Sequence, residues 1–236
     1  MAQPQLSLQP RLQAIAGLVP QGGRLADVGT DHAYLPVALL REGRIPSAIA
    51  ADLRPGPLAR ARETVARAEL EGRVAFRLCD GLTGVSPEEV DAVAIAGMGG
   101  ETIAAILAAA PWLRERAVAL VLQPMSSMPD LRRWLWEHGY RILEERLCRE
   151  GDTLYTAFSV RAGEMPPLTP AELYAGKNTN TPLRGEWLQV WTDRAARALA
   201  GLAQARGEEA GARRRETEEL LDGLRQMREE WEQWQQ

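Results

Sequence analysis

Short apolar runs alternate with longer amphipathic segments from the N-terminal region to residue 138. The apolar runs predict β-strands at 24–28, 47–53, 74–79, 91–96 and 117–123. Helical spacing of apolar residues predicts helices at 11–19, 34–43, 57–71, 100–109 and 128–138. Strand–helix alternation of this kind is typical of an α/β protein whose mostly parallel sheet is covered by helices on both faces.

Two further strand patterns follow, at 140–148 and 153–160. The link between them, which contains Glu150, Gly151 and Asp152, is too short for a crossover helix. We therefore expect these strands to form an antiparallel hairpin at the end of the sheet. This arrangement differs from the sheet of a dinucleotide-dependent dehydrogenase, which stays parallel.

Beyond a proline-rich connection at 164–170, apolar residues recur at steps of three and four, and Gly207 and Gly211 predict a turn between the two sets. The recurring positions are Leu188, Trp191, Ala195, Ala198, Leu202, Leu220, Leu224, Met227, Trp231 and Trp234. This seven-residue repeat predicts an antiparallel helical hairpin of the coiled-coil type. We expect a sheet domain over 1–165 and a helical hairpin domain over 170–236.

Composition narrows the class of protein. The net charge of −4 over 236 residues argues against a protein that coats nucleic acid by bulk electrostatics, although a local basic strip remains compatible with it. Cys79 and Cys148 form no CxxC pair, and no run of apolar residues reaches transmembrane length. The first ten residues lack a signal-peptide pattern. We expect a cytoplasmic protein with no membrane partner, and the spacing of His, Cys and acidic residues predicts no metal site.

Polar and small residues follow each predicted strand, at the edge where open parallel sheets bind ligands. Gly29 lets a ligand approach the backbone closely, and Asp52 lies where an acid commonly holds ribose hydroxyls. Asp80 is placed to accept a hydrogen bond from an adenine amino group, and the small residues at 96–100 leave room for a bulky ligand. The two acids have simpler interpretations as well: Asp52 could cap a helix, and Asp80 could be a turn residue.

The acids in these loops decide which ligand is favoured. A pyrophosphate prefers helix N-terminal amides without nearby negative charge, whereas Asp27, Asp31 and Asp52 would surround it with carboxylates. A ligand with a positive centre and an ammonium group fits better, and S-adenosylmethionine has both, with S-adenosylhomocysteine as its product. The alternatives are an NAD-dependent oxidoreductase, which the missing GxGxxG pattern disfavours, and a non-catalytic nucleotide-binding interaction protein.

Four segments, LADVGTDHAYLP, AIAADLRPGPLARA, LCDGL and VAIAGMGGETIAAIL, closely resemble the TrmK family of bacterial tRNA methyltransferases. The resemblance covers roughly residues 11 to 162. It implies a Rossmann-like class I methyltransferase that methylates N1 of adenine 22, in the D-arm region of tRNA, with another RNA as the alternative substrate. It also implies the cofactor-binding residues Asp27, Gly29, Asp31, Asp52, Leu53, Asp80, Gly81, Ala96, Gly97 and Met98.

The resemblance places Asp31 and His32 between the cofactor and the target base. We expect Asp31 to stabilise the charge on the methylated base, or to take a proton from it, and His32 to orient the base. Where the family often has Asn after the LQP segment, this chain has Met125. If that Asn contacts the base, the contact is missing here.

Candidate contacts to tRNA are the arginines at Arg132, Arg133, Arg213, Arg214 and Arg215. An equally good interpretation of 213–215 is a solvated helix face paired with nearby glutamates. The hairpin could instead serve dimerisation.

Overall fold

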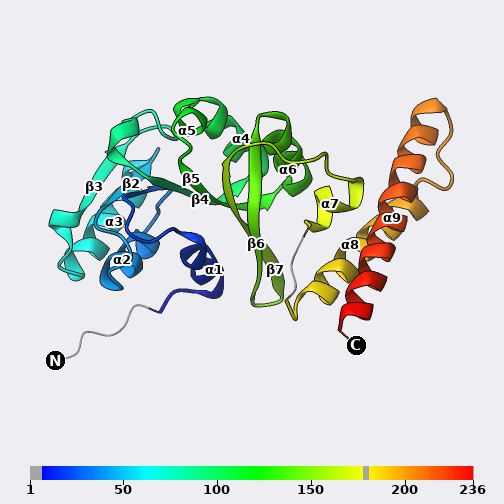
Figure 1. The fold of residues 1–236 in the computed structure, drawn as a ribbon, viewed down its shortest axis with the longest axis horizontal. Helices are drawn as coiled ribbons and strands as arrows, with labels where there is room; N and C mark the ends of the chain where they lie inside the picture. Colours follow the sequence, from blue (N-terminus) through cyan, green and yellow to red (C-terminus); the bar gives the residue numbers. More distant parts are fainter. Residues whose placement is uncertain (1–6, 178–180, 236) are drawn as a thin grey trace.

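The computed structural model describes residues 7–177 and 181–235. Its sheet has seven strands in the order β3-β2-β1-β4-β5-β7-β6 (Figure 1). The strands are β1 Leu25–Val28, β2 Ala48–Asp52, β3 Val74–Leu78, β4 Ala92–Gly99, β5 Ala119–Ser126, β6 Tyr140–Glu150 and β7 Thr153–Ala162. β1 to β5 pair in parallel, and β7 pairs antiparallel with both β5 and β6. The predicted parallel sheet with a terminal antiparallel hairpin is confirmed.

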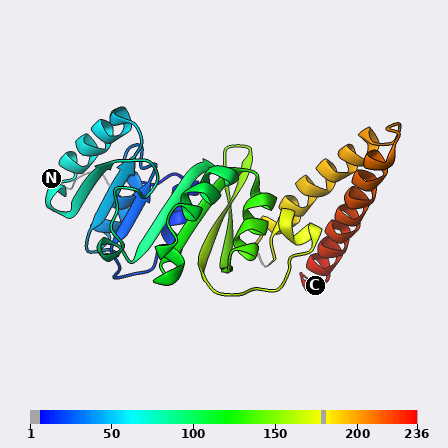
Figure 2. The ribbon, with the colours of Figure 1, turned by 90° about the horizontal axis from the view of Figure 1, so that it is seen from above.

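Helices cover both faces of the sheet (Figures 1 and 2). One face packs against α1 Pro10–Leu18, α2 Tyr34–Arg41 and α3 Pro55–Arg67. The other packs against α4 Gly100–Ala108, α5 Trp112–Glu115 and α6 Met128–Glu137. Single 3-10 turns, η1 Glu71–Arg73 and η2 Pro87–Glu89, precede β3 and β4.

The central strands are apolar on both sides because both sides are covered. In β1, Leu25 belongs to the core under α1 to α3, while Ala26 and Val28 belong to the core under α4 to α6. The sequences of such strands are continuous apolar runs rather than alternating apolar and polar residues. Asp27 is the exception, and it stands where the strand approaches its carboxyl end.

The C-terminal helices are α7 Pro170–Ala175, α8 Arg184–Gly201 and α9 Glu208–Trp234. α8 and α9 form the predicted hairpin, which projects beyond the β6–β7 end of the sheet (Figures 1 and 2). Among the described residues, none of the helices has the length and apolar content needed to cross a membrane. The division into domains at 1–165 and 170–236 stays a prediction, and residues 1–6, 178–180 and 236 of those ranges lie outside the described residues.

Three details of the predicted heptads are wrong. The turn ends at Gly207, as predicted, whereas Gly211 lies inside α9. Leu199 packs into the hairpin core while Ala198 is exposed, because the partner helix covers the side of α8 that carries Leu199.

Trp234 is 65% exposed although the heptad pattern placed it in the seam. Trp231 already lies against Gly185, at the start of α8. Trp234 therefore reaches past the end of its partner helix.

A buried polar junction joins the hairpin to the sheet, and it corrects one predicted RNA contact. Arg132 is fully buried and donates to both carboxylate oxygens of Glu145, at 3.2 and 2.8 Å. It also donates to the carbonyls of Leu173 and Tyr174 in α7. Arg132 cannot reach a phosphate, because its guanidinium is enclosed and already donates four hydrogen bonds to protein oxygens.

Arg184 completes this junction from α8. It is buried and donates to the carbonyls of Ala175 and Gly176, at 2.5 and 3.0 Å. Burial lowers the pKa of Arg184 to about 10, with Arg132 adding to the effect and Glu145 opposing it. Arginines from α6 and α8 therefore cap the C-terminal end of α7, where the helix carbonyls are otherwise unpaired.

Candidate functional site

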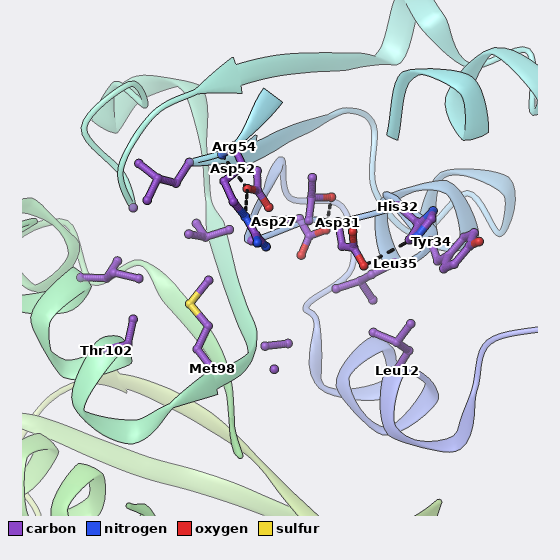
Figure 3. Close-up of a pocket in the computed structure, with 18 of the residues that line it drawn as sticks. Leu12, Asp27, Asp31, His32, Tyr34, Leu35, Asp52, Arg54, Met98 and Thr102 are labelled. Atoms are coloured by element: carbon purple, nitrogen blue, oxygen red, sulfur yellow. Dashed lines mark hydrogen bonds and ion pairs between the residues drawn. The ribbon is translucent and has the colours of Figure 1, made fainter. Parts of the chain in front are cut away.

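A cavity of about 750 Å³ opens at the carboxyl ends of the parallel strands (Figure 3). Its volume falls in the range of small-molecule and cofactor sites. Every residue that the sequence predicted for the cofactor or for catalysis lines it. These are Asp27, Gly29, Asp31, His32, Asp52, Leu53, Asp80, Gly81, Ala96, Gly97 and Met98. The strand order β3-β2-β1-β4 places these loops side by side.

Asp27, in β1, is buried beneath the cavity. The hydroxyl of Thr30 donates to its Oδ2 at 2.6 Å. Burial raises the pKa of Asp27 to about 6, and the nearby Asp52 charge adds to the rise while the Thr30 hydrogen bond opposes it. The site therefore holds one acid whose charge changes close to neutral pH.

Gly29 allows the turn after β1. Its φ of +74° is strained for any residue with a side chain, and a Cβ there would overlap the terminal methyl of Met98. Both segments line the cavity. The backbone conformation of the turn therefore favours glycine, whereas the flexible Met98 side chain could move aside for a Cβ.

The loop continues through two left-handed residues that are not glycine, Asp31 with φ 46° and Ala33 with φ 55°. Such backbone conformations are uncommon and tend to occur where function requires them. Asp31 Oδ1 accepts a hydrogen bond from Arg60 Nη2 at 2.6 Å, and its Oδ2 lies 3.7 Å from His32 Nε2. The His32 ring stacks on Tyr34 with centroids 5.1 Å apart (Figure 3). Asp31 is thus exposed, paired with Arg60 and beside a flat ring pair.

Asp52 does not cap α3, which excludes the simpler interpretation of this residue. The helix begins after Arg54, and Asp52 Oδ1 accepts the backbone N–H of Arg54 at 2.8 Å. That bond leaves Asp52 at the cavity wall with a second oxygen. Leu53 beside it is 64% exposed, which is unusual for leucine and offers an apolar surface at the rim.

Asp80 partly follows the turn interpretation. Its carbonyl accepts hydrogen bonds from the backbone and the hydroxyl of Thr83. Its carboxylate remains exposed at the cavity. The two interpretations are compatible, because one uses the main chain and the other the side chain.

Sequence reasoning missed several lining residues, because it considered only strand ends. Arg11 comes from α1, Arg60 from α3 and Thr102 from α4. Gln123, within β5, lies behind the wall, where its buried Oε1 accepts from Gly97 N at 3.1 Å and from Arg11 Nη1 at 3.0 Å. The signal for Gln123 was available: it is a polar residue in an otherwise apolar strand.

Met125, which stands where the related family often has Asn, is 45% exposed. Its sulfur lies 3.6 Å from Gln123 Nε2. The cavity lining does not include it. An Asn contact to the base is therefore absent at this position.

The remaining predicted RNA contacts lie outside the cavity. Arg133 is exposed on α6, and Arg213 and Arg215 are exposed on α9, with Arg213 paired to Glu209 at 2.7 Å. Arg214 instead donates to the carbonyl of Leu202, at the end of α8. Over residues 7–177 and 181–235, the structure contains no group of His, Cys, Asp or Glu that could hold a metal ion.

Comparison with known proteins identifies relatives. A methyltransferase domain family matches residues 8–158. A tRNA (adenine(22)-N(1))-methyltransferase of Bacillus subtilis (strain 168) is 35% identical over 160 residues, which are 68% of this chain and 67% of the relative.

Solved structures of tRNA methyltransferases are similar to this chain as well. The Bacillus subtilis M1A22 tRNA methyltransferase TrmK superposes with a TM-score of 0.84 at 28% identity, over 94% of this chain and 99% of that one. Streptococcus pneumoniae Sp1610, in complex with S-adenosyl-L-methionine, gives 0.77 at 34% identity, over 89% and 98%. The chain therefore belongs to the TrmK family of methyltransferases.

Proposed function

We propose that this protein transfers a methyl group from S-adenosylmethionine to N1 of adenine 22 in tRNA. One observation carries the proposal: the residues that the TrmK resemblance predicts for the cofactor line a single cavity, in a chain 35% identical to a tRNA (adenine(22)-N(1))-methyltransferase. The cavity has the acids, the size and the close glycine turn that this cofactor needs.

The order of the strands supports one direction for the cofactor along the cavity. Asp80 and Gly81 follow β3, at one end of the row, and receive the adenine edge beside the apolar Leu53. Asp52 follows β2 and holds the ribose hydroxyls. Gly29 and the 96–98 loop, which follow β1 and lie in β4, would then hold the methionine part.

When bound, S-adenosylmethionine supplies an electrophilic methyl group, which N1 of the adenine takes in an in-line displacement. The protein's contribution is to hold the two reactants in line and to stabilise the cationic base that results. Asp31 provides the carboxylate for that charge. His32, stacked on Tyr34, provides a flat surface that orients the base. The base must leave its stack in the tRNA to reach this cavity.

The direct test is methyl transfer from labelled S-adenosylmethionine to two transcripts of one tRNA, one with adenine at position 22 and one with guanine. We expect label to enter only the first, at N1 of adenine. Equal labelling of both transcripts would reject the position. Labelling of other RNA but not of tRNA would favour the alternative substrate class.

A further inference from the structure

The proposed cofactor carries a carboxylate as well as its positive groups, and the cavity is rich in acids. Asp27, Asp31, Asp52 and Asp80 all line it. A ligand carboxylate placed among them is repelled unless a cation meets it. The cavity must therefore offer a cation at the methionine end of the bound cofactor. This reasoning rests on the proposed function.

Three arginines line the cavity, and two are paired with its own acids. Arg60 donates to Asp31 at 2.6 Å. Arg54 lies beside Asp52, at the β2 end where the ribose is placed, and is mostly exposed. The third arginine, Arg11, is paired with none of the acids that line the cavity.

Arg11 lies at the methionine end. Its Nη1 donates to Gln123 Oε1 at 3.0 Å, and the same oxygen accepts from Gly97 N. The Arg11 guanidinium thus lies against the β4 loop, on the side of β5 and away from β3. Leu12, its neighbour on α1, faces the same cavity across from Met98 (Figure 3).

Arg11 is held in place by Glu150, an acid that does not line the cavity. Its backbone N–H donates to Glu150, and its Nε lies 3.8 Å from that carboxylate, near the limit for an ion pair. The Tyr155 ring lies 5.9 Å from the guanidinium carbon. With the side chain 21% exposed, the fork is oriented and still accessible from the cavity.

We propose that Arg11 binds the α-carboxylate of S-adenosylmethionine, with Gln123 holding the guanidinium in position. A planar, pre-oriented fork suits a carboxylate, because it donates two parallel hydrogen bonds. Arg11 is then a cofactor-binding residue contributed by a helix that precedes the first strand of the sheet.

The test compares two ligands on two proteins by calorimetry. Decarboxylated S-adenosylmethionine keeps every group of the cofactor except the carboxylate. We expect Arg11→Gln to weaken binding of S-adenosylmethionine by about tenfold or more, the loss expected for a charge-assisted contact. The same variant should change binding of the decarboxylated ligand by less than about twofold. Arg11→Lys should recover part of the loss, since it keeps the charge without the fork.

Arg54→Gln is the matched control, since it removes a cation from the same cavity at the ribose end. It should not distinguish the two ligands. Equal weakening of both ligands by Arg11→Gln would overturn the assignment and show that Arg11 acts through the 96–98 loop. Unchanged binding of both, with a raised KM for tRNA, would also overturn it and favour a phosphate contact. Absence of methyl transfer by the unaltered protein would instead reject the proposed function itself.

Discussion

Asp27 lies in β1 and Asp31 in the loop that follows it, and their environments are opposite. Asp27 is buried under the Thr30 hydroxyl, and burial raises its pKa to about 6. Asp31 is exposed, has left-handed backbone and is paired with Arg60. Asp27 therefore influences the stability of the fold and the attraction of a positively charged cofactor. Asp31, in contrast, is accessible to a substrate.

Substitution of Asp31 tests its proposed contact with the base. We expect Asp31→Asn to lower kcat by about a hundredfold or more, since a neutral amide cannot stabilise the cationic product. The Kd for S-adenosylmethionine should change much less. Steady-state kinetics and calorimetry measure the two. Asp130→Asn, an exposed acid on α6, is the control, and near-normal kcat in Asp31→Asn would remove Asp31 from the chemistry.

The pKa of Asp27 predicts how stability depends on pH. Folding raises it from 3.8 to about 6, so the folded state binds more protons than the unfolded state between these values. The free energy of unfolding therefore falls as pH rises through this window. Asp27→Asn removes this pH-dependent loss of stability. We expect the gain in the free energy of unfolding, relative to the unaltered protein, to be about 2 kcal/mol larger at pH 7.5 than at pH 4.5.

Urea unfolding of the ligand-free protein at both pH values measures this difference, with Asp130→Asn as the control. The variant should also bind S-adenosylmethionine more weakly, because a positive ligand loses a buried acid. A gain that is equal at the two pH values would show that the charge of Asp27 is not its cause.

At the scale of elements, α7 connects the hairpin to the sheet. Its carbonyls are capped by Arg132 from α6 and Arg184 from α8, and Glu145 from β6 pairs with Arg132. A Cβ at Gly176 would overlap the Glu145 carboxylate. Three elements therefore meet the end of α7 without free space, which fixes the direction of α8.

The neighbouring arginines of α6 test this junction. Arg132→Met leaves Glu145 buried without its partner, and we expect a loss of about 3–5 kcal/mol in the free energy of unfolding. Arg133→Met, one position along and exposed, should change it by no more than about 0.5 kcal/mol. Urea denaturation compares them. Similar values for both variants would mean that the buried pair does not hold the junction.

At the scale of the whole molecule, strands β1 to β4, whose carboxyl ends carry the cavity, and the hairpin lie toward opposite ends of an elongated structure (Figures 1 and 2). We propose that 1–165 carries out the chemistry and that 170–236 holds tRNA at a distance from it. Arg213 and Arg215 are exposed on α9, while Arg214 is used to close the turn of the hairpin. Dimerisation through the hairpin is the alternative.

The double variant Arg213→Gln/Arg215→Gln separates these roles. If both residues contact phosphates, tRNA affinity falls and the salt dependence of binding loses about one unit of slope per contact. Arg225→Gln, on the same helix, is the control. Filter binding over a salt series measures this, and light scattering measures the oligomeric state. Unchanged affinity with a changed oligomeric state would favour dimerisation.

Local pattern was enough to predict most of the fold and the cofactor loops. Strand and helix periods are properties of neighbouring residues, so the sheet, its antiparallel end and the hairpin could be predicted, as could Asp27, Asp52 and Asp80 at strand ends. The choice of Ala198 over Leu199 failed because apolar spacing alone does not say which residue the partner helix covers.

Only the tertiary structure decided which arginines are accessible and which are enclosed. Arg132 and Arg133 are adjacent and chemically identical, yet one is buried by α7 and the other faces solvent. Arg11 meets Gln123 across 112 positions of sequence. Such contacts depend on how distant elements pack, and no period along the chain encodes them.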